Sequence, residues 1–127
     1  MTTFIAAVVS VEELPECEAF VVGFSEQADG DGHTLQLQIT LQDDPSQGYL
    51  NYYCLISDDQ ATFYGGITGC KLSPGQLELA LAQDACGELN VQDGYMINFE
   101  LGPDEFFRLK VGLQRILDRG PSKLLVS

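Results

Sequence analysis

The sequence predicts an α+β fold, in which a twisted antiparallel β-meander of about seven strands carries one C-terminal helix packed on a face. Two periodicities support this fold class, because apolar residues recur at every second position up to about residue 101 and with a helical period after Pro103. Strands therefore come first and the helix last, which is not the order of repeated βαβ units. The 127 residues suffice for one hydrophobic core, and we expect residues 1–127 to form a single domain.

The first elements are predicted from β-branched and aromatic runs. Residues 3–11 and 19–24 are expected to pair as a hairpin, and the acidic stretch 12–17, which contains Pro15, suits the loop between them. Residues 34–42 give the clearest strand, because leucine and isoleucine alternate there with uncharged polar residues. That alternation is typical of an antiparallel strand with one face in water.

The middle of the chain continues the series of strands. Residues 49–57 have apolar side chains on both faces, which suits a central strand or one that the helix covers. Residues 67–72 follow a Gly-Gly turn and are predicted to form a hairpin with residues 76–81 through the turn at 73–75. Residues 95–101 alternate again and are the last expected strand.

The C-terminal helix has start and stop signals. Pro103 fits the first helical position, and Asp104 and Glu105 follow where the helix dipole favours negative charge. Arg115 and Arg119 are expected in the last turn, before a Gly-Pro pair ends the helix. One apolar face is formed by Phe106, Leu109, Leu113, Ile116 and Leu117.

Two further segments carry weaker signals. Residues 84–90 favour one more short helical turn. Residues 123–127 suit either an edge strand or a frayed end.

The charge is distributed unevenly along the chain. The first seventy residues carry eleven acidic side chains and no lysine or arginine, a net charge of −11, and the remaining residues contribute −2. An excess of acidic residues raises the association rate with a basic partner. A surface that is simply solvated by water would also account for this excess. Nucleic acids and anionic membranes are disfavoured as partners, because both are recognised by lysine and arginine.

Composition also indicates the compartment. No apolar run is long enough to span a bilayer, and no basic residue precedes the apolar stretch at the start. We therefore expect a cytoplasmic protein. The four cysteines, Cys17, Cys54, Cys70 and Cys86, form no metal-binding spacing, and we interpret them as small buried hydrophobic residues.

The sequence offers little for catalysis, so we expect neither an enzyme nor a cofactor. His33 is the single histidine, in a turn, and no nucleophile motif accompanies it. The Asp-Gly-Asp-Gly run at 29–32 resembles the start of a calcium loop, but the twelfth position, where such a loop needs glutamate, is Thr40. We therefore expect a surface histidine, an acidic hairpin loop and no metal site.

An aromatic cluster lies in the most acidic half of the chain. It comprises Tyr49, Tyr52, Tyr53, Phe63 and Tyr64. Cross-strand packing explains such a cluster, and an interface anchor is the functional alternative. A tyrosine beside Asp58 and Asp59 would bind a basic side chain through both charge and ring.

Three segments carry a family resemblance. Residues 52–56, the Phe-Tyr-Gly-Gly-Ile run at 63–67 and residues 71–79 resemble the immunity protein 10 family of bacterial polymorphic toxin systems. Residues 98–101 and the helix at 106–117 are similar as well, so the likeness covers roughly residues 3–118. The resemblance implies a cytoplasmic antitoxin that binds and neutralises a cognate toxin domain, without catalysis or cofactor.

Charge and resemblance together favour an immunity protein with a basic toxin as partner, acting as a monomer or homodimer. The predicted partner-binding residues are Asp43, Asp44, Asp58, Asp59 and Tyr64. The alternative is an acidic chaperone of the type III secretion kind that binds an effector segment, and such proteins typically open with an amphipathic helix. A third possibility, a small-ligand pocket under the helix, needs converging polar groups that the sequence does not supply.

Overall fold

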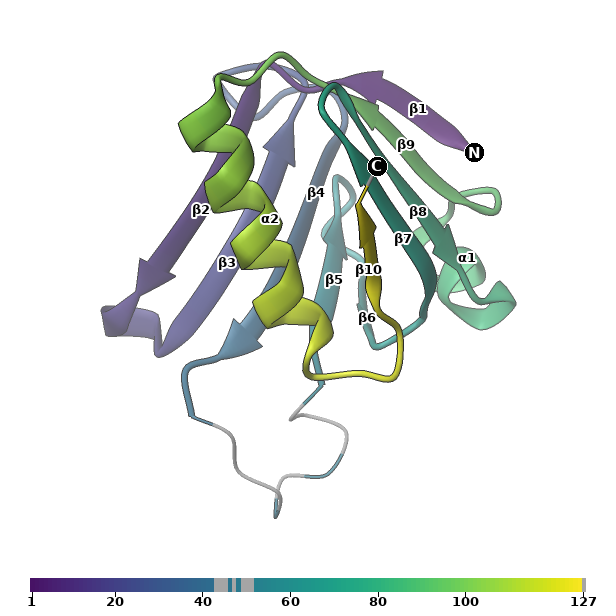
Figure 1. Cartoon of the computed structure of the whole chain (residues 1–127). Coiled ribbons are helices and arrows are strands. Elements are labelled where there is room, and N and C mark those ends of the chain that lie inside the picture. Colours follow the sequence, from purple (N-terminus) through teal and green to yellow (C-terminus); the bar gives the residue numbers. More distant parts are fainter. Residues whose placement is uncertain (43–45, 47, 49–51, 127) are drawn as a thin grey trace.

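Two five-stranded sheets form the body of the protein (Figure 1). The computed structural model describes residues 1–42, 46, 48 and 52–126. Within these residues the strands are β1 (Thr2–Ile5), β2 (Val8–Leu14), β3 (Ala19–Ser25), β4 (Thr34–Thr40), β5 (Cys54–Ser57), β6 (Thr62–Tyr64), β7 (Ile67–Ser73), β8 (Gln76–Leu81), β9 (Gly94–Asn98) and β10 (Leu124–Val126). The helices are α1 (Gln83–Leu89) and α2 (Pro103–Leu117), and a 3-10 turn, η1, spans Pro15–Cys17. The predicted α+β class with a C-terminal helix is confirmed, but the strands do not form one meander.

The predicted meander is present as one of the two sheets, which we call the meander sheet. Its strands follow in chain order, β2-β3-β4-β5-β6, and each neighbouring pair is antiparallel. The inner face carries apolar side chains such as Val22, Leu37 and Leu55, each fully buried. The outer face carries the uncharged polar side chains that made β4 recognisable in the sequence.

The other sheet, which we call the mixed sheet, has the order β1-β9-β8-β7-β10. Its centre is antiparallel, but β1 pairs with β9 and β10 pairs with β7 in parallel. Residues 3–11 are therefore not one strand. The Ala6 N–H donates to Asn98 in the mixed sheet, and the Ala7 N–H donates to Ser25 in the meander sheet, so the chain changes sheet between these two residues.

The expected N-terminal hairpin is correct only for its second half. β2 pairs with β3 without interruption from Val8 to Leu14. The predicted acidic loop at 12–17 is therefore too long, because its first three residues extend the strand and only η1 makes the turn. Cross-strand pairing outweighs the weak strand preference of Glu12 and Glu13.

The Gly-Gly turn joins the two sheets. It links β6 of the meander sheet to β7 of the mixed sheet, and both glycines have positive φ, 79° at Gly65 and 93° at Gly66. A Cβ at Gly66 would lie 2.7 Å from the Ala85 Cβ of α1 and 3.0 Å from the Phe63 ring. The turn therefore needs glycine for both its conformation and its close packing.

The core lies between the inner faces of the two sheets and beneath α2. Figure 1 shows α2 crossing β2, β3 and β4, and its predicted apolar residues Leu109, Leu113 and Ile116 are fully buried. Gly112 lets the helix approach closely, because a Cβ there would lie 2.9 Å from Val11 and 3.2 Å from Val22. The helix thus covers the part of the meander sheet that the mixed sheet leaves open.

The remaining predicted elements differ in small ways. α1 and β10 confirm the weak helical turn and the edge strand. α2 ends at Leu117, so Arg115 lies in its last turn and Arg119 lies just beyond it. All four thiols are free, with Cys54 and Cys70 buried as expected, Cys86 intermediate, and Cys17 exposed in η1, contrary to the prediction.

Candidate functional site

Three of the predicted partner-binding residues lie within the described part of the chain, and these three do not form one cluster. Asp58 and Asp59 lie in the tight turn between β5 and β6, whereas Tyr64 is at the opposite end of β6. Asp43 and Asp44 lie outside the described residues, as does Tyr49. Asp58 and Asp59 thus lie together, and β6 separates them from Tyr64.

The aromatic cluster divides between core and surface. Tyr53 is 1% exposed, and its hydroxyl oxygen accepts a hydrogen bond of 2.9 Å from the Ile67 N–H. Tyr52 and Tyr64 are 50% and 38% exposed. Tyr64 pairs with Cys54 across β5 and β6 and faces outward from the meander sheet. Packing therefore explains Tyr53, whereas Tyr52 and Tyr64 are both partly exposed at the surface.

The β5–β6 turn lies beside the loop between β3 and β4. Both connections leave the same end of the meander sheet, because Ser25 pairs with Thr34 and Leu35 pairs with Ser57. Five carboxylates belong to these two connections, and we call them the acidic rim: Glu26, Asp29, Asp31, Asp58 and Asp59.

Hydrogen bonds within the β3–β4 loop fix its shape. The Glu26 N–H donates to the His33 carbonyl at 2.9 Å, and the His33 N–H donates to Glu26 Oε1 at 3.0 Å. At the tip, Asp29 Oδ1 accepts from the Asp31 N–H at 2.9 Å. The loop is therefore an ordered hairpin connection. This geometry agrees with the interpretation of residues 29–32 as an acidic hairpin loop.

His33 connects the loop to two other segments. Its Nδ1 lies 3.4 Å from Asp58 Oδ2, and its ring stacks on Phe4 of β1 with the centroids 5.6 Å apart. The side chain is 46% exposed, so His33 is a surface residue as expected, but one that is held from two sides. The sequence did not reveal this contact, because Phe4, His33 and Asp58 come from three distant segments.

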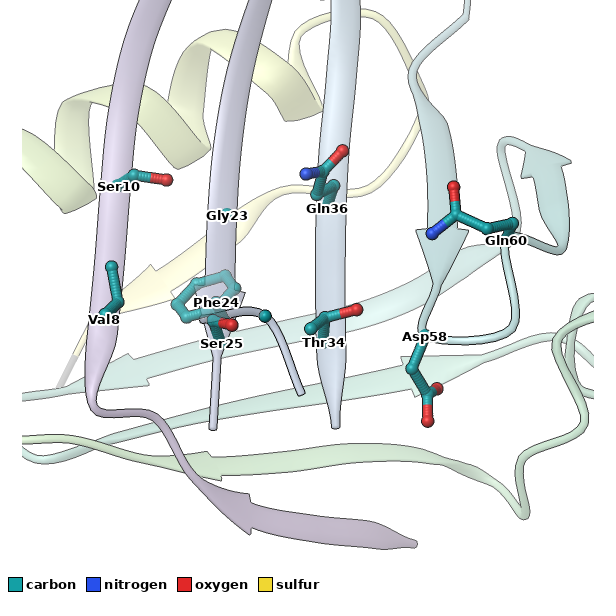
Figure 2. Close-up of a pocket in the computed structure, with 10 residues that line it drawn as sticks. Val8, Ser10, Gly23, Phe24, Ser25, Thr34, Gln36, Asp58 and Gln60 are labelled. Atoms are coloured by element: carbon teal, nitrogen blue, oxygen red, sulfur yellow. The ribbon is translucent and has the colours of Figure 1, made fainter. Parts of the chain in front are cut away.

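A polar hollow opens in the outer face of the meander sheet beside the acidic rim (Figure 2). Its volume is about 270 Å³, and it spans β2, β3 and β4 and reaches the loop tip and the β5–β6 turn. Its lining residues are Val8, Ser10, Gly23, Phe24, Ser25, Gly30, Thr34, Gln36, Asp58 and Gln60. Of these lining residues, the sequence pointed only to Asp58 and to the acidic loop that contains Gly30.

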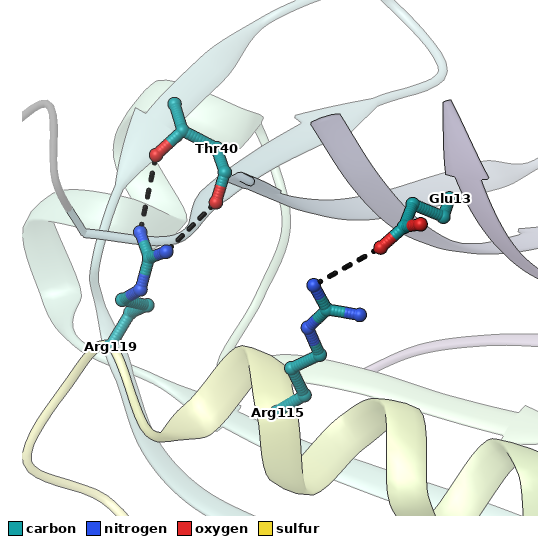
Figure 3. A network of polar contacts seen from close by, with 4 residues as sticks. All are labelled: Glu13, Thr40, Arg115 and Arg119. Atoms are coloured by element: carbon teal, nitrogen blue, oxygen red, sulfur yellow. Dashed lines mark hydrogen bonds and ion pairs between the residues drawn. The ribbon is translucent and has the colours of Figure 1, made fainter. Parts of the chain in front are cut away.

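The arginines of the C-terminal region hold α2 on the meander sheet (Figure 3). Arg115 lies 3.3 Å from Glu13 and 4.3 Å above the centroid of the Phe20 ring. Arg119 donates to the carbonyl and hydroxyl oxygens of Thr40 at 2.8 and 3.2 Å. Among the described residues, no lysine or arginine forms an ion pair with a carboxylate of the acidic rim. The acidic rim therefore keeps most of its negative charge.

Cys70 and Tyr95 are the two buried groups whose pKa values are raised most. Burial raises the pKa of the Cys70 thiol from 9.0 to about 12. Burial, and then the charges of Asp58 and Asp59, raise the pKa of the Tyr95 hydroxyl from 10.0 to about 12. Both groups therefore stay protonated in the folded protein at a pH where the unfolded chain loses their protons.

Alkaline pH is therefore expected to destabilise the protein. The stabilisation from protonated Cys70 and Tyr95 is complete below their unfolded pKa values and is lost as the pH rises towards 12. The free energy of unfolding should therefore fall by about 4 kcal/mol between pH 8 and pH 11. Urea unfolding followed by circular dichroism at stepped pH measures this fall. The Tyr95→Phe variant should lose the part of the fall that begins above pH 10, and an unchanged profile in that variant would contradict the assignment.

Neither a metal centre nor a membrane span is found in the described residues. No three His, Cys, Asp or Glu side chains there lie together as metal ligands would. No helix among them is long and apolar enough to cross a membrane. The site is thus an acidic, polar surface beside a small hollow.

The comparisons with known proteins agree with the family resemblance. The family model described as Immunity protein 10 matches residues 5–107, a span that includes the meander sheet, strands β7, β8 and β9 and the start of α2. No curated protein and no solved structure matches the chain. The family prediction made from the motifs is thereby confirmed.

Proposed function

The chain belongs to the immunity protein 10 family, and from this membership we propose that it neutralises one cognate toxin by binding it through the acidic rim. Family membership makes it an immunity protein of a toxin system. The acidic rim supports two further parts of the proposal, namely that the toxin is basic and that it binds at the rim. We place the complex in the cytoplasm and propose that residues 1–127 act as a single domain, as monomer or homodimer.

The charge distribution supports this choice of surface. Asp29, Asp31, Asp58 and Asp59 are all exposed, and no lysine or arginine occurs in the first seventy residues. The arginines of the C-terminal region contact the meander sheet and leave the rim uncompensated. Uncompensated surface charge of one sign steers an oppositely charged partner and speeds its association.

The secretion chaperone is less well supported. The two helices contain 7 and 15 residues, so strands dominate the described structure. The immunity protein is therefore the better supported of the two functions.

Co-expression tests the proposal. The cognate toxin domain, to be identified from the reading frames beside this gene, is induced in a host cell with and without the chain, and growth is followed. We expect growth arrest without the chain, normal growth with it, and one co-eluting peak of the two proteins in size-exclusion chromatography. Growth arrest that the chain does not relieve, together with separate elution, would refute the proposal.

A further inference from the structure

A glycine, Gly23, lies inside β3 and lines the hollow. Gly23 pairs with Ser10 on one side and with Gln36 on the other, so these three positions form one row across the outer face. A Cβ on Gly23 would lie 2.8 Å from Ser10 Oγ and 3.9 Å from Gln36 Cγ. Glycine in a strand interior costs stability and often marks a place where another group approaches the backbone.

The walls of the hollow offer oxygen acceptors from several strands. Ser10, Ser25, Thr34, Gln36 and Gln60 each contribute a hydroxyl or an amide, and Figure 2 shows these side chains spread over neighbouring strands and the β5–β6 turn. The Ser25 hydroxyl already donates to the Gln27 carbonyl at 2.9 Å, so its oxygen is left to act as an acceptor. The described lining contains no lysine or arginine.

Asp58 supplies the charge at the edge of the hollow. Its side chain is 33% exposed, and His33 holds it from the loop side at 3.4 Å. A partly buried carboxylate forms stronger ion pairs than one in free solvent. The hollow therefore combines one fixed negative charge with neutral acceptors.

We propose that this hollow receives one arginine side chain of the toxin. This inference rests on the proposed function and adds the contact that fixes the toxin's position. A guanidinium group carries five N–H donors in a plane and suits acceptors spread over several residues, whereas the ammonium group of lysine carries three donors at one point. Asp58 accepts from the guanidinium, the hydroxyls and amides take the remaining donors, and Val8 packs against the aliphatic stem.

Two variants test the hollow separately from the general charge. Asp58→Asn removes the counter-ion with little change in shape, and Gly23→Val fills the hollow without changing the charge. Gly23→Ala serves as a smaller plug if valine impairs folding, which circular dichroism would show. Glu88→Gln is the matched control, because Glu88 is exposed on α1 and its replacement removes the same unit of charge away from the hollow.

Surface plasmon resonance with the purified cognate toxin domain measures the outcome. We expect the dissociation rate to rise at least about tenfold for Asp58→Asn and for Gly23→Val, and to change less than about twofold for Glu88→Gln. One arginine of the toxin should couple to Asp58 by about tenfold in a double-mutant cycle, and its replacement by lysine should weaken binding.

The results separate this inference from the proposed function. Wild-type dissociation rates for both variants, with the wild-type complex intact, would overturn the inference and leave the proposed function standing. The same holds if no toxin arginine couples to Asp58, or if lysine replaces that arginine without loss. Failure of the wild-type chain to bind the toxin at all would instead refute the proposed function.

Discussion

Replacing Gly94 by alanine is expected to lower the free energy of unfolding by at least about 3 kcal/mol. Gly94 opens β9 with φ of 139°, a conformation that L-residues with a side chain rarely adopt. Its Cβ would overlap the Leu79 carbonyl oxygen and lie 3.2 Å from the Ala80 Cα. These atoms belong to the backbone of β8 at the centre of the mixed sheet, so they cannot move aside without breaking the pairing.

Gly87→Ala is the matched control for this variant. Gly87 lies within α1, and nothing is within 4 Å of the position that its Cβ would occupy. Alanine at this position should leave the free energy of unfolding unchanged or raise it by up to about 1 kcal/mol, because alanine has a higher helix propensity than glycine. Urea unfolding of both variants measures the difference. A Gly94→Ala protein within about 1 kcal/mol of the wild type would contradict the described packing of β8 and β9.

Reversing the charge of the β5–β6 turn is expected to abolish protection against the toxin. The double variant Asp58→Lys, Asp59→Lys replaces two negative charges of the acidic rim with two positive ones, opposite a basic partner. Like charges placed against each other cost several kcal/mol, so the affinity for the toxin should fall at least about a hundredfold. The turn is exposed, so folding should be unaffected.

The control for charge reversal is Glu16→Lys, Glu88→Lys. It makes the same change in net charge at two exposed positions, one in η1 and one in α1, both outside the rim. Calorimetric titration with the toxin at fixed salt compares the two double variants. Equal losses of affinity in both would mean that net charge alone matters, and the rim would no longer be the binding surface.

Local patterns predicted much of the fold. The alternation in β4, the hairpin of β7 and β8, and the start of α2 at Pro103 all follow from short-range signals in the sequence. The division of the strands into two sheets does not follow from such short-range signals. β1 pairs with β9, more than ninety residues later, and the change of sheet at Ala6 and Ala7 carries no local turn signal.

The site was predictable to a smaller extent. Asp58 and Asp59 were recognisable because adjacent acids in a turn point to solvent. Their contact with His33 depends on pairing between strands that a single sequence does not fix. Gly23 was the missed signal, because a glycine inside an apolar strand run often marks a close approach. Tyr64 was grouped with Asp58 in the predicted surface, whereas in the structure Asp58 lies in the turn before β6 and Tyr64 lies at the far end of that strand.

Amide hydrogen exchange with and without the cognate toxin domain tests the acidic rim most directly as the binding surface. We expect the toxin to slow exchange in the β3–β4 loop, residues 26–33, and in the turn at residues 58–61, while α2 and β10 keep their rates. Slower exchange confined to α2, or to the outer face of the mixed sheet, would contradict the proposal that the toxin binds at the acidic rim.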